Sequence, residues 1–262
     1  MPAQQSDQQT DPAGRAAATL QTVATSTEHL LHTVAELPPQ AVAEPSALPG
    51  WSRGHLLSHL SRNADSLINL LESARTGRDI PQYASDEARE QGIEEGAARP
   101  LEEQLADLRA SAERLAAVAA ALPAPAWQAE LKHRHGYTFP AWELPAKRLA
   151  ELEYHHVDLD AGYTPAHWPA GFAAEEFARL GARYADLEGL PGLALVATDG
   201  DARALLGPAG SAEDAELLVE GPLRALTAWL SGRSDGDGLQ VHRGGVQQDD
   251  PRTALPTLPP MG

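Results

Sequence analysis

The stretch from Trp51 to Ala74, WSRGHLLSHLSRNADSLINLLESA, constrains the fold more than any other part of the chain. If it is wound at about 100° per residue, its apolar side chains fall on one stripe. The stripe consists of Leu56, Leu57, Leu60, Ala64, Leu67, Leu70 and Leu71. The Pro49-Gly50 pair breaks the chain just before this stretch, and Ser52 can then cap the first turn. The pattern predicts one amphipathic helix.

Three further segments share this helical period: residues 15–37, 101–122 and about 140–161. Proline pairs follow the first two and are expected to end them. Aromatic residues make up only 5% of the chain, and Ala and Leu dominate its middle, which favours helices packed through small and aliphatic side chains. Between the helices, we expect a long connection with a short helical piece around 86–92, and a hairpin or extended loop near 127–140.

The composition changes from about residue 165. Residues 171–188 read as a helix, and short strands are predicted at 193–199, near 202–207, at 215–221 and near 238–244. A short amphipathic helix should precede the last strand and end at Gly232, and the Pro-rich tail is expected to pack or fray. We therefore predict a disordered leader at residues 1–13, a helical domain at 14–164 and a small α/β domain at 165–262.

The net charge of the chain narrows the choice of partners. There are 20 basic and 37 acidic residues, which gives a formal charge of −17. A field of that sign repels phosphate backbones and anionic lipid, so nucleic acid and membranes are not expected as partners. A small-molecule substrate is expected instead, and an anionic one would need a metal or a placed arginine. We expect a monomer.

The chain has no cysteine, so any metal must be held by histidine and carboxylate side chains. The opening MPAQQSDQQTDPAG has neither a cationic start nor an apolar core, so it does not resemble a signal peptide. No apolar run approaches 18 residues. These features predict a cytoplasmic protein.

Two histidines lie in the first turns of the helix that begins after Trp51. His59 falls on the edge of the apolar stripe, whereas His55 lies further round toward solvent, so His59 is the better candidate for a buried site. The other histidines of the helical part are expected to be ordinary surface or packing residues: His29, His32, His133 and His135.

The helix predicted near 140–161 offers two pairs of possible metal ligands. Glu151 and His155 are four residues apart, so they lie on one face and can reach the same ion. Glu153 and His156, three apart, form a competing pair. His156 sits nearer the apolar stripe than His155 does, so the pattern alone leaves the choice open.

Four strings in matching order resemble the mycothiol-dependent maleylpyruvate isomerase family: LPGWSRGHLLSHLSRNADSL, TGRDIPQYASDEARE, RLAELEYHHVDLDAGY and SGRSDGDG. The resemblance runs along nearly the whole chain apart from its leader. It implies an α+β protein in which a DinB-like four-helix bundle precedes a small α/β domain similar to sterol-carrier folds.

The resemblance also implies a ligand set. It assigns the metal to His59, Glu151 and His155, and leaves Glu153 and His156 as packing or supporting residues. Asp158, just after the pair, is a candidate to orient a ligand by hydrogen bonding.

A further implied residue lies in the C-terminal part. The family has an arginine in a Gly-Arg motif at the end of its last helix, near the metal cleft, and the equivalent here is Arg233. It would act in catalysis and in cofactor binding. Arg224, on the same predicted helix, is the alternative, and a plain role of Arg233 at the helix C-terminus is the simpler interpretation.

The implied activity is the zinc- and mycothiol-dependent conversion of maleylpyruvate to fumarylpyruvate. The thiol would add to the cis double bond, the resulting single bond would rotate, and elimination would give the trans isomer. Arg233 would stabilise the negative charge that develops. The alternatives are an S-transferase that attaches mycothiol, or another low-molecular-weight thiol, to an electrophile, and a metal- or ligand-binding module without catalysis.

Overall fold

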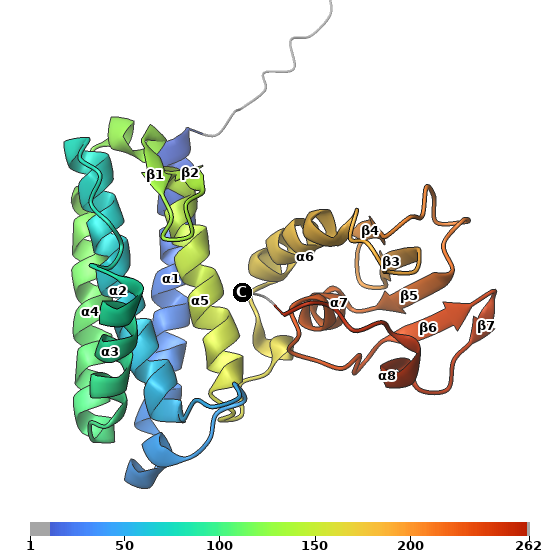
Figure 1. Ribbon diagram of the computed structural model, residues 1–262, viewed down its shortest axis with the longest axis horizontal. Coiled ribbons are helices and arrows are strands. Elements are labelled where there is room, and N and C mark those ends of the chain that lie inside the picture. The colour runs from blue at the N-terminus through green and yellow to red at the C-terminus, as the bar shows by residue number, and fades with distance from the viewer. Residues whose placement is uncertain (1–10, 261–262) are drawn as a thin grey trace, which may run out of the picture. The chain divides into compact units, whose positions relative to one another are not determined.

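A computed structural model describes residues 11–260 of the chain (Figure 1). The predicted leader therefore lies almost wholly outside the described residues. Two compact units meet between Gly162 and Tyr163, two residues before the boundary expected from the sequence. No helix among residues 11–260 combines the length and the apolar character that crossing a membrane requires.

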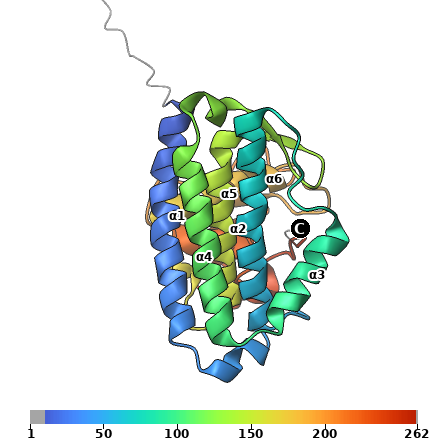
Figure 2. The same cartoon turned by 90° about the vertical axis from the view of Figure 1, so that its left-hand side faces the viewer.

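The first unit is a four-helix bundle of α1 (Pro12–Ala35), α2 (Arg53–Thr76), α4 (Leu101–Ala121) and α5 (Leu144–Asp158). Figure 2 shows the four helices side by side. Helix α2 packs against α4, and α1 packs against α5. Part of the core lies at one end of the bundle, where the stripe of α2 meets the end of α4 and the start of α5, through Ala64, Leu67, Leu70, Leu71, Leu115, Ala119, Leu122, Trp127 and Leu144.

Helix α2 begins and ends where its sequence predicts. The Ser52 side chain accepts a hydrogen bond from the backbone of His55, and the His55 ring accepts one in return from the backbone of Ser52. Gly77 ends the helix with a φ of 69°, a left-handed conformation that glycine adopts without strain. These two signals fix the bounds of α2 and hence the faces on which its histidines lie.

The connection after α2 contains more helix than the sequence predicted. Helix α3 runs over Asp86–Ala97, five residues beyond the expected short piece, and packs against α2. The two helices approach closely at Gly96, where a Cβ atom would lie 2.1 Å from Oγ of Ser58. The extra turn is stabilised by this tertiary contact, which the polar sequence of α3 does not reveal.

The remaining elements of the first unit are short. A hairpin of β1 (Glu130–Lys132) and β2 (Thr138–Pro140) confirms the hairpin interpretation of this stretch. Helix α5 begins at Leu144, later than expected, because a 3-10 turn occupies Ala141–Glu143. Further 3-10 turns lie at Pro39–Ala43 and Ala124–Gln128.

The second unit contains a five-stranded mixed sheet in the order β4-β3-β5-β6-β7. Its strands are β3 (Leu193–Ala197), β4 (Arg203–Leu206), β5 (Leu217–Gly221), β6 (Gln240–Arg243) and β7 (Val246–Gln247). Strands β3 and β5 pair in parallel, whereas the other neighbouring strands of this sheet pair antiparallel. Helix α7 (Leu223–Leu230) follows β5. Helix α6 (Ala170–Tyr184) packs on α7, after a 3-10 turn at Pro165–His167.

The fold class predicted from the sequence is confirmed by this helical bundle with a small α/β unit after it. Two small elements were not predicted. Strand β7 has only two residues, and α8 (Pro251–Ala254) forms a single turn just before the Pro-rich tail, where the Asp250 side chain caps it. Neither is long enough to give a period in the sequence.

Candidate metal centre

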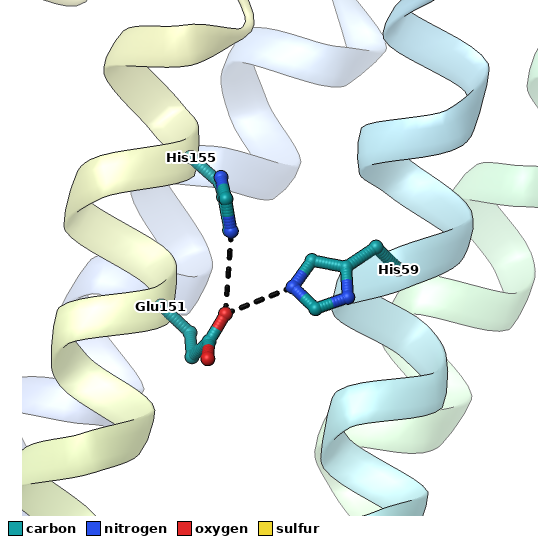
Figure 3. A group of neighbouring side chains, drawn as sticks. All are labelled: His59, Glu151 and His155. Carbon is teal, nitrogen blue, oxygen red and sulfur yellow. Dashed lines mark hydrogen bonds and ion pairs between the residues drawn. The ribbon is translucent and has the colours of Figure 1, made fainter. Parts of the chain in front are cut away.

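Three side chains from two helices converge inside the bundle (Figure 3). His59 comes from α2, and Glu151 and His155 come from α5. The Oε2 atom of Glu151 lies 2.9 Å from Nε2 of His59 and 3.3 Å from Nε2 of His155. One potential ligand atom from each residue lies within 4.8 Å of the other two. A single ion can therefore be reached by all three.

Local sequence explains this convergence. Glu151 and His155 are four residues apart on α5, so both project from one face. His59 is 5% exposed and lies at the edge of the buried stripe of α2. Its ring meets the ring of His155 edge to face, with 4.8 Å between centroids. The structure thus brings together the three residues that were expected from the sequence to bind a metal.

Asp158 supports the outer side of His155. Its Oδ2 atom lies 2.9 Å from Nδ1 of His155, and the side chain is buried. The hydrogen bond expected from the sequence is therefore present. A carboxylate at this position holds the imidazole proton on Nδ1, which leaves the Nε2 lone pair directed at the centre.

The surroundings shift the pKa values of the three residues in different directions. Burial lowers the pKa of His59, and its contact with Glu151 offsets this only in part. Burial also acts to lower the pKa of His155, but Asp158 and Glu151 outweigh it and raise that pKa. Burial acts to raise the pKa of Glu151, but the two histidines outweigh it and hold it well below its ordinary value. At neutral pH Glu151 is an anion and His59 is neutral.

This donor set fits a divalent ion such as zinc. Two imidazole nitrogens and one carboxylate oxygen are ligands that zinc prefers, and three protein ligands leave a position for water or substrate. One of the two histidines is also held from behind by a carboxylate, as ligating histidines commonly are, since Asp158 hydrogen-bonds to Nδ1 of His155. The residues present therefore fit a catalytic type of site better than a closed structural one.

The competing pair on α5 faces another helix. The Ser26 hydroxyl donates to a carboxylate oxygen of Glu153, and Nε2 of His156 lies 2.8 Å from Oγ1 of Thr33. Both partners belong to α1. His156 is more deeply buried than His155, as the apolar pattern indicated, but it is buried in the α1 interface and away from His59.

The other histidines of the bundle lie apart from the centre. His55 caps α2 and contacts Glu94 at 3.3 Å, while His29 and His32 are exposed. His133 stacks on Tyr137 with 4.4 Å between centroids, and burial is the main reason that its pKa falls to about 4. These positions agree with the surface and packing roles expected for them.

Arg233 occupies a helix-capping position in the second unit. Its backbone N–H donates to the carbonyl of Ala228, and Gly232, with a φ of 72°, donates to Trp229, which is the Schellman pattern at the end of α7. Nη1 of Arg233 donates to the carbonyl of Ser231 at 2.8 Å. Arg224 donates to the carbonyl of Trp168. The structure therefore shows the capping role, and the catalytic role stays a prediction.

Three residues near the centre were not expected from the sequence. Nη2 of Arg89, on α3, lies 3.4 Å from Nδ1 of His59. Tyr83 and Arg148 are both influenced by the charge of Glu151. The spacing of Arg148, one turn before Glu151 on α5, was the one signal that could have indicated its position.

The fold and the centre define a class: a two-unit protein whose helical bundle carries a candidate His-Glu-His metal site. Comparison with known proteins identifies the family within this class. The sequence model of the mycothiol maleylpyruvate isomerase N-terminal domain matches residues 23–160. The chain belongs to that family.

Solved structures extend the likeness beyond the bundle. A crystal structure of the mycothiol-dependent maleylpyruvate isomerase is 27% identical, with a TM-score of 0.79, and the match covers 86% of this chain and 92% of that one. A crystal structure of a histidine-to-alanine mutant of that enzyme matches with the same identity and coverage and a TM-score of 0.78. No curated protein sequence matches the chain.

Proposed function

We propose that this chain is a zinc- and mycothiol-dependent isomerase that converts maleylpyruvate to fumarylpyruvate. The observation that carries the proposal is the convergence of His59, Glu151 and His155 in a member of this family. The likeness to a solved mycothiol-dependent maleylpyruvate isomerase, over most of both chains, supports the substrate and the thiol.

The three residues would hold zinc, and Asp158 would keep His155 in the tautomer that offers Nε2 to the ion. Zinc bound there would lower the pKa of a thiol that reaches the site and make it a nucleophile near neutral pH. The burial of His59 excludes water from one side of the centre, which strengthens every charge interaction within it.

Maleylpyruvate and fumarylpyruvate are isomers at the same oxidation state, so the reaction consumes no co-reactant and the thiol is regenerated. The cis double bond of maleylpyruvate gains the thiolate sulfur at one carbon, and the electron pair moves toward the conjugated carbonyl. The bond that has become single rotates, and expulsion of the same thiolate restores the double bond as trans. The protein's contribution is to hold the substrate and to stabilise the negative charge on the carbonyl oxygen.

Arg233 is proposed as a source of that stabilisation. The proposal is supported by its place in the SGR motif, and its half-buried guanidinium already donates to one carbonyl in the second unit. We further propose that the protein is cytoplasmic and monomeric. Its partners would be a small anionic substrate and a low-molecular-weight thiol.

Metal content and turnover measured together test this function. Wild-type protein should hold about one zinc ion per chain and isomerise maleylpyruvate only when mycothiol is supplied. His59→Ala should lose both, whereas His29→Ala, which removes an exposed histidine of α1, should keep both. If zinc is retained and maleylpyruvate is untouched, the isomerase proposal is wrong, and attachment of the thiol to an electrophile becomes the activity to assay.

A further inference from the structure

Two arginines close to the candidate metal centre lack an acidic partner. In a chain with a net charge of −17, most buried or half-buried cations would be expected to find one. Arg53 and Arg62, which are half-buried, do so. Within residues 11–260, no ion pair joins Arg89 or Arg148 to a carboxylate, which leaves their positive charge available to the site.

Arg148 is a buried, fixed positive charge. Its side chain is 1% exposed, and Nη1 donates to the carbonyl of Leu60 at 2.9 Å and to Oδ1 of Asn63 at 2.8 Å. Nη2 is buried and, within the described part of the chain, has no hydrogen-bond partner. A buried guanidinium with an unpaired N–H is costly, so its retention one turn from Glu151 indicates a role in the charge of the centre.

Arg89 is the more accessible of the two. It is half-buried on α3, and its Nη2 atom lies 3.4 Å from Nδ1 of His59. Its guanidinium also lies 6.0 Å from the ring of Tyr83, measured to the centroid. Burial raises the pKa of Tyr83, although Ser66 and Arg89 act in the opposite direction. The tyrosine therefore keeps its proton at neutral pH and can donate a hydrogen bond.

The chain around Tyr83 is held in place from two sides. The side-chain amide of Asn69 on α2 donates to the carbonyl of Gln82 at 3.0 Å. On the other side, the backbone N–H of Arg134 in the hairpin donates to Oε1 of Gln82 at 2.8 Å. Gln82 itself is buried. Tyr83 is thus positioned by a fixed segment, as binding residues require.

A divalent metal ion would make the charge close to the centre positive. Glu151 and Asp158 supply two negative charges, and Arg89 and Arg148 supply two positive charges. A divalent ion would leave an excess of two positive charges in a poorly solvated place. Cations are not expected beside a metal site unless anions also enter it, because like charges at close range repel strongly. The excess therefore points to an anionic ligand.

The hydrogen-bonding groups lead to the same conclusion. When His59 gives its Nε2 lone pair to a cation, the neutral ring carries its proton on Nδ1. Nδ1–H and the guanidinium of Arg89 then become two donors that face each other. Both are satisfied if a carboxylate lies beside them and accepts a hydrogen bond from each.

We propose that Arg89 and Tyr83 form a carboxylate-binding subsite beside the metal centre, inside the helical bundle, with Arg148 as the fixed positive charge behind it. Arg89 contacts the carboxylate of the substrate directly. This inference rests on the proposed function, because it names where the anionic substrate of that reaction is held. It places a substrate-binding cation in the bundle itself, independently of Arg233.

Binding of maleate, a dicarboxylate with a cis double bond, tests the subsite without turnover. Calorimetric titration of the zinc-loaded protein would compare wild type with Arg89→Gln and Arg78→Gln. Arg78 is exposed and precedes Arg89 in the same connection, so its loss changes the net charge equally. We expect binding to weaken about 10- to 100-fold in Arg89→Gln, as for loss of a charge-assisted hydrogen bond. Arg78→Gln should stay within about twofold, and all three proteins should hold equal zinc.

Several outcomes would overturn the proposal. Failure of maleate to bind wild type, equal affinity in wild type and Arg89→Gln, or loss of zinc from Arg89→Gln would each do so. The last would show that Arg89 only positions His59. Arg89→Lys gives a further check, since it keeps the charge but not the forked geometry and should recover part of the affinity.

Measuring isomerisation as well as maleate binding distinguishes a failure of this subsite from a failure of the proposed function. If maleate binds through Arg89 but maleylpyruvate is not isomerised with mycothiol, the subsite stands and the proposed function fails. If isomerisation proceeds with an unchanged KM in Arg89→Gln, the function stands and the subsite fails. If both hold, KM should rise in Arg89→Gln by about the factor found for maleate.

Discussion

Replacement of Asp158 by asparagine tests how the candidate centre holds a metal. Asp158 is 3% exposed, and its Oδ2 atom lies 2.9 Å from Nδ1 of His155. Asparagine has nearly the same shape and keeps an oxygen that can accept the same hydrogen bond. The substitution therefore removes the negative charge behind His155 while retaining its orientation.

The expected loss of zinc affinity follows from the two kinds of hydrogen bond. A hydrogen bond to a charged partner contributes about 1.5–3 kcal/mol, and a neutral one about 0.5–1.5 kcal/mol. The difference, about 1–1.5 kcal/mol, corresponds to roughly tenfold weaker binding in Asp158→Asn. Asp158→Ala loses the hydrogen bond altogether and should weaken binding about 100-fold, the upper end for residues that support metal-bound histidines.

Competition with a chelator of known affinity would measure these differences on folded protein. Asp160→Asn is the matched control, because Asp160 is exposed, two residues away, and adopts a φ of 52° that asparagine tolerates. It should bind zinc as wild type does. Equal affinity in Asp158→Asn and wild type, or an equal loss in both asparagine variants, would refute the supporting role of Asp158.

Three further predictions concern pH, packing and the second unit. The pKa of His155 is raised, so below that pKa a proton competes with zinc for the imidazole. Zinc affinity should therefore fall about tenfold for each pH unit below the pKa of His155 and become constant above it. A zinc affinity that does not change with pH would contradict this prediction. Gly96→Ala would place a Cβ atom 2.1 Å from Oγ of Ser58. It should lower the free energy of unfolding, measured by urea titration, by about 1–3 kcal/mol. Unchanged stability would show that α3 can shift away from α2 without cost. Arg233→Ala should keep zinc and lower turnover, with a stability loss under about 1 kcal/mol from its contact with Ser231; loss of metal or of folding would show a different role.

The helices of the bundle were predictable because their signals are local. The bounds of α2 follow from Ser52 and Gly77, which act within one turn of the helix ends. Once the bounds and the stripe are known, the place of His59 at the edge of the buried face follows from the helical period. The four-helix bundle and the mixed sheet after it could be expected from such patterns and from the family resemblance.

The choice of ligands on α5 could not be made from the pattern because this helix is buried on two faces. Glu153 and His156 contact Ser26 and Thr33 of α1. Glu151 and His155 face α2 instead. A hydrophobic stripe reports only the more apolar of two buried faces, and on α5 that is the face toward α1. The less apolar face of α5, which carries Glu151 and His155, is the one on which a metal site can form. The apolar pattern therefore pointed to the wrong face for choosing the ligands.

The cations beside the centre show why the remaining features depend on tertiary contacts. Arg148 stands one turn before Glu151, so its face of α5 could be inferred from spacing alone. It becomes a buried charge because Leu60 and Asn63 of α2, 88 and 85 positions away in the chain, accept its hydrogen bonds. Without these acceptors an arginine at this position would extend to solvent, since burying an unpaired charge costs several kcal/mol. Helical period thus predicts the direction of the side chain, but contacts between α2 and α5 decide whether its charge stays in the site, and that charge determines whether an anion is attracted to the centre.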